Sequence, residues 1–442
     1  MDIISLKKHP LFTGTIILTA TGLTSRIIGF LYRIFLSHTI GAEGLGIYQL
    51  VFPVLALCLS LCTGGIQTAI SKFTAESDNF SPFCCGFCIC ITLSVCCSFV
   101  IYRNAPWLAA HVISESACEP LLRIMSLSLP FACLHACFNG YYYGKNKTAI
   151  PALSQLFEQV VRVFSVYLFY MIQMEKQAPM TPALAMWGTV CGEAAAALFC
   201  LTTFHFRRMH LSFSVMRRLI SFATPLTGSR VILNLFASAE SILIPPALIA
   251  FGYDHAQALS VFGTLTGMAM PVIALPTVLT GSLSVLLLPA ISESASKGNS
   301  EQITQTIRRT VELCVIVGLS CTLAFLLFGH FAGRLLFRSE LAGSFIVSLG
   351  FMCPFLFLTG TLSSILHGLN LTLYTFLLNM ATCGLRLLAI WLLVPRLGLY
   401  IYLWSVLLSQ IIQAAAYLYL LMRFRKRKKR THKPSALPSI VC

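Results

Sequence analysis

The chain has 442 residues, of which 57% are hydrophobic and only 10% are charged, and its mean hydropathy is +0.81. Because a soluble globular domain carries about 25% charged residues, this composition excludes a soluble protein and predicts a polytopic membrane protein. The formal net charge is +16, but basic residues crowd into the C-terminal tail at 423–442. We therefore expect a protein integral to the membrane with no nucleic-acid partner.

Apolar segments recur along the whole chain, and each is long enough to cross a bilayer core of about 30 Å. We expect an all-α polytopic membrane protein with about twelve transmembrane helices. The segments fall at 13–38, 45–71, 83–103, 121–144, 149–172, 183–206, 219–250, 258–290, 308–331, 342–367, 373–394 and 399–422. The first is too long for the apolar region of a signal peptide and lacks a small-residue cleavage site, so we interpret it as an uncleaved span.

The first span carries two arginines, Arg26 and Arg33, at membrane depth. On a helix their face is small and polar, with Thr15, Thr19, Gly22 and Gly29. An arginine at the bilayer centre costs at least about 2.5 kcal/mol and keeps its proton. Two explanations remain open. The arginines form internal ion pairs that hold helices together, or they lie two turns apart along a cavity that receives a phosphate-bearing substrate, which the planar guanidinium grips better than lysine does.

Further charged or polar residues lie inside the predicted spans. Glu158 and Arg162 are four residues apart on the fifth span, which is the spacing of a helical ion pair. The others have no obvious partner nearby in the sequence: Glu193, Arg230, Asn234, Glu240 and Arg386. Arg230 and Asn234 share a face of the seventh span and are the second candidates for substrate binding. Glu240 is a candidate counter-charge or coupling acid, as are Glu193, Glu158 and Arg162, and the sequence does not separate these roles.

The eighth span is rich in helix-breaking residues. Pro271 and Pro276 fall five residues apart, with Gly267 and Gly281 on either side. We expect this helix to be kinked or locally unwound. One interpretation is a bend that fits the helix to its neighbours, and the other is a broken helix that gates a central transport site.

Eighteen cysteines invite a metal or disulfide interpretation, which we reject. Six of them crowd the third span, where no histidine has the spacing of a zinc ligand and the surroundings are apolar. We interpret them as small hydrophobic residues. We expect no metal and no cofactor, with an ion gradient or the membrane potential as the candidate source of energy.

The chain also has signs of an internal duplication and of a fixed orientation. Residues 69–72, AISK, and residues 290–293, AISE, end the second and eighth spans, 221 residues apart. We therefore expect an N-terminal six-helix lobe at 1–210, a C-terminal six-helix lobe at 211–422 and a basic tail at 423–442. Lys and Arg favour the loops on the side of the N-terminus, which predicts that both termini are cytoplasmic and that the tail rests on anionic lipids.

Three runs carry a resemblance to a known family: SRIIGFLYRIFLSHTIGAEGLGIYQLVFPV from Ser25, ISKFTAE, and LTGMAMPVIALPTVLTG with LLPAISE. They resemble the stage V sporulation protein B group of the MOP flippase superfamily, relatives of the lipid II flippase. The resemblance implies a V-shaped, MATE-like pair of six-helix lobes and alternating access that moves a polyprenyl-diphosphate-linked sugar across the membrane. It also implies a cavity role for Arg26. For Arg33 the register of the match is one residue off.

We therefore expect a flippase in the cell membrane that moves a peptidoglycan or polysaccharide precursor from the inner to the outer leaflet, with spore envelope formation as one expected setting. A cation-coupled multidrug exporter is the alternative, although it needs an acidic ion site. A membrane scaffold for sporulation is a further alternative, but it needs neither buried arginines nor broken helices. No loop is long enough to fold a catalytic domain, so we do not expect an enzyme. We expect a monomer.

Overall fold

The computed structural model of the chain describes residues 10–76, 80–204, 211–278 and 300–431, together with 280, 281, 287 and 291. Almost all of these residues are helical, and none of them is in a strand. The expected all-α class is confirmed. The apolar segments of the sequence account for this, because a backbone inside a bilayer must satisfy its own hydrogen bonds and a helix does so within one segment.

The first half of the bundle contains seven α-helices and one π-helical turn among the described residues. They are α2 (Pro10–Thr39), α3 (Gly41–Thr63), α4 (Ile66–Glu76), α5 (Ser81–Trp107), η1 (Leu108–Ile113), α6 (Cys118–Gly144), α7 (Ala149–Glu175) and α8 (Pro182–Thr203). The second half contains α9 (Phe213–Phe251), α10 (His255–Gly263), η2 (Thr264–Ala269), α11 (Met270–Ala274), α13 (Ser300–Phe337), α14 (Glu340–Gly350), α15 (Cys353–Gly368), α16 (Thr372–Leu392), α17 (Val394–Leu397) and α18 (Leu399–Thr431).

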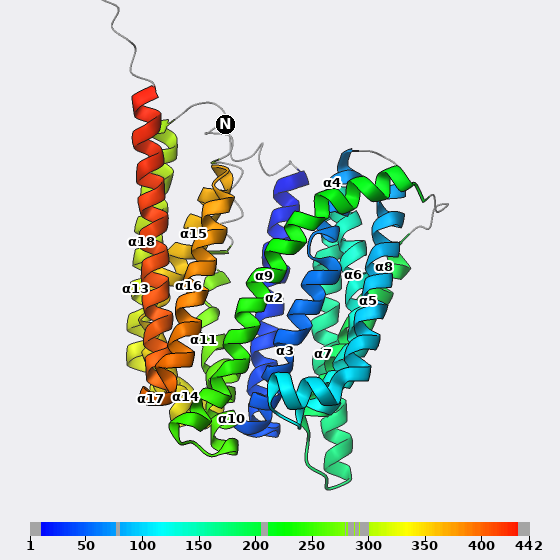
Figure 1. Cartoon of the computed structure of the whole chain (residues 1–442), viewed down its shortest axis with the longest axis vertical. Helices are drawn as coiled ribbons and strands as arrows, with labels where there is room; N and C mark the ends of the chain where they lie inside the picture. The colour runs from blue at the N-terminus through cyan, green and yellow to red at the C-terminus, as the bar shows by residue number, and fades with distance from the viewer. Residues whose placement is uncertain are drawn as a thin grey trace, which may run out of the picture.

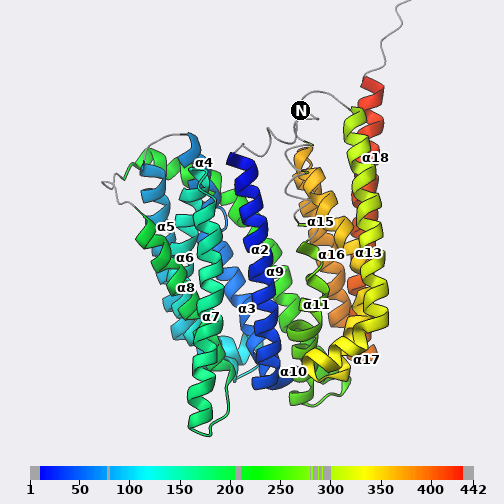
Figure 2. The same cartoon turned by 180° about the vertical axis from the view of Figure 1, so that it is seen from behind.

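Among the described residues, nine helical stretches are long and apolar enough to cross a membrane, and the bent pair α14 and α15 raises this number to ten. Helices α2 and α7 are 30 and 27 residues long and run alongside the others (Figures 1 and 2). Charged residues inside these two helices lower their hydropathy. If α2 and α7 are also spans, the described part of the chain contains twelve, and this number stays a prediction.

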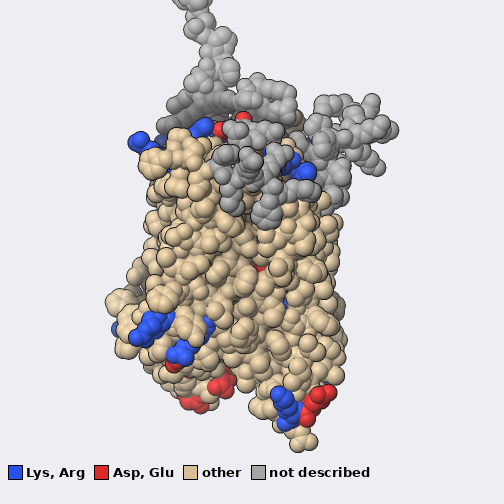
Figure 3. All heavy atoms as spheres, turned by 90° about the vertical axis from the view of Figure 1, so that its right-hand side faces the viewer, with Lys and Arg blue, Asp and Glu red and all other residues tan. Residues whose placement is uncertain are grey.

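Charged side chains gather at the two ends of the bundle. Figure 3 shows Lys, Arg, Asp and Glu near both ends of one face, with an almost uncharged belt between them. The start of α2 and the end of α18 lie at the same end of the bundle (Figure 1), as an even number of spans requires. This arrangement agrees with termini on one side of a membrane, and the assignment of that side to the cytoplasm stays a prediction.

Helices α2, α3, α9 and α10 lie in the middle of the bundle, between α5 to α8 on one side and α13 to α18 on the other (Figures 1 and 2). Helices α3 and α10 approach each other through glycines. A Cβ atom on Gly46 would lie 2.2 Å from the carbonyl oxygen of Leu259, and one on Gly263 would lie 2.1 Å from that of Ala42. The division into lobes at residues 210 and 211 stays a prediction, because residues 205–210 lie outside the described part.

The eighth span is interrupted as expected. It begins as α10, changes to the π-helical turn η2 and returns to the α-form in α11. A turn at Leu275 and Pro276 interrupts it again, and the described residues after that turn, 277, 278, 280, 281, 287 and 291, are helical. Two other irregularities carry no clear signal in the sequence. Helix α5 runs into the π-helical turn η1 just after Pro106, and the tenth span is bent by 56° between α14 and α15.

Candidate functional site

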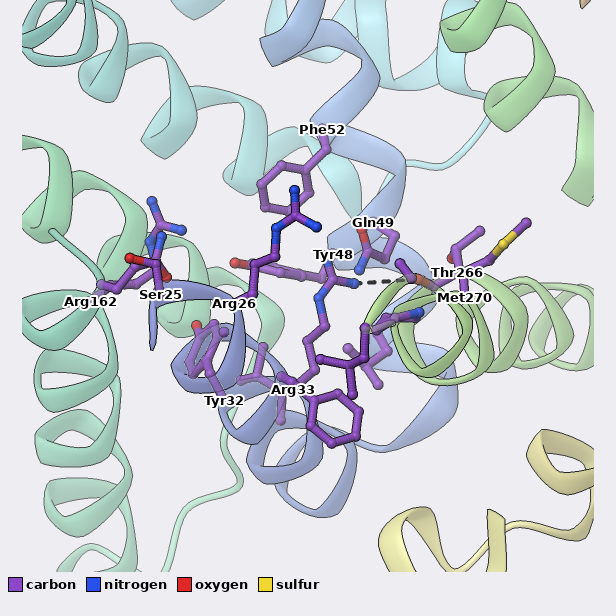
Figure 4. A pocket seen from close by; sticks show the side chains of 18 of the residues that line it. Ser25, Arg26, Tyr32, Arg33, Tyr48, Gln49, Phe52, Arg162, Thr266 and Met270 are labelled. Atoms are coloured by element: carbon purple, nitrogen blue, oxygen red, sulfur yellow. Dashed lines mark hydrogen bonds between the residues drawn. The ribbon is translucent and has the colours of Figure 1, made fainter. Parts of the chain in front are cut away.

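A cavity of about 610 Å³ opens in the middle of the bundle (Figure 4). Its walls come from α2, α3, α7 and the broken eighth span. Its polar lining residues are Ser25, Arg26, Arg33, Tyr32, Tyr48, Gln49, Gln159, Arg162, Thr266 and Thr277. The remaining walls are largely aromatic and aliphatic, with Phe30, Leu36, Leu45, Phe52 and Met270. Three guanidinium groups therefore meet one space that is otherwise apolar or uncharged.

Arg26 and Arg33 reach this cavity from the same face of α2, as their spacing in the sequence predicts (Figure 4). The Nη1 atom of Arg26 donates a hydrogen bond of 3.1 Å to the hydroxyl of Thr277. Within the described part of the chain, neither arginine has an acidic residue within ion-pair distance. The positive charge of each guanidinium group is therefore not balanced by a described carboxylate, and each group has further N–H donors that can bind a ligand.

The contact of Arg33 follows from the break in the eighth span. In the π-helical turn the N–H of Met270 donates to the carbonyl of Leu265, five residues earlier. The next donor in that pattern belongs to Pro271, which has no N–H, so the carbonyl of Thr266 loses its helical partner. The Nη1 atom of Arg33 donates to that carbonyl oxygen at 3.3 Å. The proline thus creates an acceptor that fixes one of the cavity arginines.

Arg162 brings a third guanidinium group from α7, but this arginine already has a partner. It forms the expected ion pair with Glu158, one turn earlier on the same helix. Its Nε atom is buried and has no hydrogen-bond partner among the described residues. The hydroxyl of Ser25 on α2 is likewise buried without a partner among the described residues. Both groups could therefore hydrogen-bond to a ligand at the cavity wall, because no described residue of the protein bonds to them.

The second pair of candidate substrate residues lies beside the cavity. Asn234 on α9 lines a smaller cavity of about 230 Å³ that shares Gln49, Phe52 and Thr266 with the first. Its Nδ2 atom donates to the carbonyl of Ala56 at 3.5 Å. Arg230, one turn away, is exposed and lines neither cavity, and its side chain lies against Gly64 at the junction of α3 and α4.

Glu240 has a partner that the sequence does not indicate. One carboxylate oxygen lies 3.2 Å from the Nη2 atom of Arg386 on α16, and the other accepts a hydrogen bond of 2.8 Å from the hydroxyl of Tyr402 on α18. Glu240 is buried at the point where α9, α16 and α18 meet. It is therefore the counter-charge of Arg386, at a distance from the cavity lining.

Glu193 lies in a buried cluster whose histidine the sequence analysis missed. The Nδ1 atom of His135 on α6 is 3.5 Å from a carboxylate oxygen of Glu193 on α8. Three residues of this cluster each offer one ligand atom, and these atoms lie within 4.8 Å of one another: His135, Glu158 and Glu193. This geometry is able to hold a cation. The three residues come from three different helices, so the sequence does not show that they meet. The one local signal is a polar histidine inside the apolar fourth span.

The candidate gating residues lie at different points of the eighth span. Pro271 lines the cavity, and Pro276 lies in the turn that follows α11. Gly267, in the π-helical turn, packs against the side chain of Leu45, whereas a Cβ on Gly281 would meet open space. The span is thus irregular where it faces the arginines, and the gating role of these residues stays a prediction.

Comparisons with known proteins agree with this architecture. A family model described as polysaccharide biosynthesis protein matches residues 11–295. Stage V sporulation protein B of Bacillus subtilis (strain 168) is 30% identical to the chain over 388 residues, which make up 83% of this chain and 74% of that relative. The match to the family model includes the arginine-bearing first span and the broken eighth span as parts of a much longer similarity.

Two solved structures have a similar fold. The lipid II flippase MurJ in its inward closed conformation matches with a TM-score of 0.74 and 14% identity, covering 94% of this chain and 90% of its own. An inward-facing multidrug resistance MATE family transporter of the MOP superfamily also matches with a TM-score of 0.74 and 14% identity, covering 95% and 99%. These likenesses confirm the expected MOP-type fold. At such identity they say nothing about a shared substrate.

Proposed function

Since the chain belongs to the polysaccharide biosynthesis protein family, we propose that it is a flippase that carries a polyprenyl-diphosphate-linked saccharide from the inner to the outer leaflet. The single observation that carries this proposal is the pair Arg26 and Arg33. Both face a cavity at membrane depth without an acidic partner among the described residues. A charge in that position is expensive unless a ligand of opposite charge uses it.

The chemistry of the cavity fits a diphosphate. Two guanidinium groups on one helix face offer paired N–H donors to phosphate oxygens, and Arg162 adds a third from α7. The volume of about 610 Å³ lies within the range of about 300 to 1,000 Å³ of ligand pockets. Gln49, Gln159 and Tyr48 offer neutral hydrogen-bonding groups of the kind that bind sugar hydroxyls. We propose that the polyprenyl chain remains in the surrounding lipid.

Alternating access would open this cavity to each side of the membrane in turn. We propose that the lobes at 1–210 and 211–422 rock against each other and that the broken eighth span, with Pro271, Pro276, Gly267 and Gly281, takes up the change in shape. A helix whose hydrogen-bond ladder is already interrupted bends with little further loss. An ion gradient or the membrane potential would supply the energy.

The charge of the cavity speaks against export of organic cations. The arginines make its wall positive, and the buried acids Glu158 and Glu240 each already pair with an arginine. A cationic substrate would meet repulsion from Arg26 and Arg33 and no free carboxylate on the described wall. Nothing in this arrangement of groups requires a chemical reaction, so we propose transport without catalysis.

The setting of the protein is also part of the proposal. We propose a monomer in the cell membrane with both termini in the cytoplasm and the basic tail at 423–442 against anionic lipids. Its saccharide would be a precursor of peptidoglycan or another polysaccharide. The name of its relative, stage V sporulation protein B, supports a role in spore envelope formation.

The test is transport by purified protein in liposomes. Arg26→Ala removes both the positive charge and the planar set of N–H donors, whereas Arg26→Lys keeps the charge alone. We expect transport of a polyprenyl-diphosphate-linked saccharide to fall steeply in the first variant and partly in the second. The matched control is Arg396→Ala, because Arg396 is exposed on α17 and lines neither cavity. If Arg26→Ala folds normally and transports at the parental rate, the proposed role of the cavity is wrong.

A further inference from the structure

A smaller cavity of about 230 Å³ adjoins the cavity of the arginines. The two cavities lie side by side, because they share three lining residues, Gln49, Phe52 and Thr266. Gln49 and Phe52 extend from α3 into the cavity that holds the arginines (Figure 4). The proposed function assigns nothing to the smaller cavity. Its other lining residues come from α3, α9 and α10: Pro53, Ala56, Asn234, Ala237, Ser238, Ser241 and Phe262.

The smaller cavity differs from the first in its charge. None of the described residues that line it is charged, whereas three arginines line the first. Two carboxamides and two serine hydroxyls supply groups that both donate and accept hydrogen bonds, and Phe52 and Phe262 add two aromatic rings. A phosphate would find no positive partner on this lining. The combination suits a neutral molecule with many hydroxyl groups and apolar C–H faces, which is the chemistry of a sugar ring.

The polar groups that α9 brings to this cavity have hydrogen-bonding capacity left. Asn234 uses one N–H in its contact with the carbonyl of Ala56, so the other N–H and the amide oxygen remain for a ligand. Ser238 donates its hydrogen to the carbonyl of Pro53 at 3.0 Å, so its oxygen can still accept. The hydroxyl of Ser241 has no hydrogen-bond partner in the described part of the chain.

Gln49 lies where the two cavities meet, and both its side chain and its main chain can bind a ligand. Its carboxamide has no hydrogen-bond partner among the residues that the structure describes. Pro53, four residues later in α3, has no N–H, so the carbonyl of Gln49 lacks its regular helical donor. A proline thus frees a carbonyl on α3, as Pro271 does on the eighth span.

The contacts of the two arginines give a direction to a ligand that fills both cavities. Thr266 lines both cavities, and its carbonyl accepts the hydrogen bond of Arg33. Arg26 donates instead to Thr277, which lines the first cavity but not the second. A diphosphate held between the arginines would therefore present the phosphate nearer Arg33 to the smaller cavity.

We propose that the smaller cavity is a saccharide subsite that binds the first sugar of the lipid-linked substrate, as a neutral pyranose ring. Gln49, Asn234 and Ser241 hydrogen-bond to its polar substituents, and the two aromatic rings pack against its C–H face. The volume lies below the range of about 300 to 1,000 Å³ for drug-sized ligands, which suits a single ring. The subsite rests on the proposed function, because the arginines hold the diphosphate to which the sugar is attached.

The experiment compares two soluble probes that differ only in the sugar: geranyl diphosphate and geranyl-diphospho-N-acetylglucosamine. Calorimetry measures their binding to the full chain in lipid nanodiscs. We expect the sugar to raise the affinity of the wild-type protein by about tenfold, the equivalent of about 1.4 kcal/mol. The double variant Asn234→Leu with Ser241→Ala should lose this advantage and still bind geranyl diphosphate as the wild type does. Ser241→Ala alone, which keeps the contact of Asn234 with α3, should lose part of it.

The matched control is Ser229→Ala, which removes a hydroxyl of α9 that lines neither cavity and should leave the affinity for both probes unchanged. A third probe carries glucuronic acid in place of N-acetylglucosamine. It should bind no better than geranyl diphosphate, because a buried carboxylate would find no charged partner on the described lining. Binding as tight as that of the neutral sugar would overturn the assignment to a neutral ring.

The outcomes separate the subsite from the diphosphate site. If the sugar adds nothing to the affinity of the wild type, or if the double variant keeps the full advantage, the subsite is wrong and the diphosphate function stands. If the sugar raises the affinity through Asn234 and Ser241 but Arg26→Ala changes the affinity for neither probe, the diphosphate function fails and the subsite stands. If neither probe binds, both are wrong.

Discussion

Two groups of arginines inside the helix bundle have opposite surroundings. Arg386 on α16 lies against the carboxylate of Glu240, whose other oxygen accepts a hydrogen bond from Tyr402. Among the residues that the structure describes, Arg26 and Arg33 on α2 have only neutral partners, the hydroxyl of Thr277 and the carbonyl of Thr266. The first arginine is neutralised by the fold. The other two remain charged in a cavity.

The contrast separates structural charges from functional ones better than burial or depth does. A paired charge is needed by its partner, so the fold suffers when it is removed. An unpaired charge at membrane depth is a cost to the fold, so it is kept for what it binds. Substitutions at the two places should therefore have opposite signatures, with loss of stability at one and loss of transport at the other.

The largest expected effect is on the paired group. Arg386→Ala leaves Glu240 as an uncompensated buried charge, so we expect a loss of about 3 to 5 kcal/mol of stability. The double variant Arg386→Leu with Glu240→Gln removes both charges and should recover most of that loss. Unfolding in detergent, followed by the accessibility of the buried cysteines, measures both. Equal stability of Arg386→Ala and the wild type would mean that the ion pair is not structural.

The next effect falls on transport instead of stability. Arg33→Ala removes a charged donor from the cavity, and we expect transport to fall by about 10- to 100-fold, the equivalent of about 1.5 to 3 kcal/mol for a hydrogen bond to a charged group. The melting temperature should remain close to that of the wild type, since water in the cavity can reach the carbonyl of Thr266. Arg33→Lys is the matched control for charge. A strongly destabilised Arg33→Ala protein with normal transport would reverse the comparison.

A smaller effect is expected from the helix that faces the unpaired arginines. Pro271→Ala with Pro276→Ala restores two backbone donors, and the carbonyl of Thr266 then regains a helical partner in competition with Arg33. We expect the double variant to bind a diphosphate but to transport it several-fold more slowly. Cysteines placed near Arg26 should then be labelled from one side of the membrane only. Labelling from both sides with undiminished transport would show that the break in the eighth span only fits the helix to its neighbours and has no role in transport.

The smallest effect belongs to an ion pair outside the core. Arg123 and Glu119 lie 2.8 Å apart, one turn from each other at the start of α6; Arg123 is exposed and Glu119 is half-buried. Arg123→Ala should change stability by no more than about 0.5 kcal/mol and should leave transport unaltered, because water replaces the lost partner. The same unfolding and transport assays apply. A loss of stability as large as that of Arg386→Ala would show that the loss of the ion pair, and not its burial, decides how much stability is lost.

Much of the fold was predictable from the sequence because membrane spans are set by local composition. Each described span overlaps its predicted apolar segment, and the prolines of the eighth span marked a true break. The face shared by Arg26 and Arg33 also followed from helical spacing alone. These features depend on residues within one helix, and helical periodicity is readable without tertiary contacts.

The remaining features depend on contacts between helices, which the sequence does not encode locally. The pairing of Glu240 with Arg386 joins residues far apart in the chain, and Glu193 comes close to Glu158 because glycines let α7 and α8 approach closely. Helices α14 and α15 are joined by a bend, although the apolar sequence before Pro354 contains no strong helix-breaking signal. The exposed position of Arg230, away from the cavity, likewise follows from how α9 packs on α3.

The most direct test of the account measures binding at both groups of arginines with one ligand. Undecaprenyl diphosphate is titrated into the purified wild-type protein, the double variant Arg26→Ala with Arg33→Ala, and the double variant Arg386→Leu with Glu240→Gln. We predict that the first double variant folds and binds at least about 100-fold more weakly, since two charged hydrogen-bonding groups are lost, whereas the second binds as the wild type does. Equal affinity of the Arg26 and Arg33 variant and the wild type would contradict the claim that the unpaired arginines hold the diphosphate.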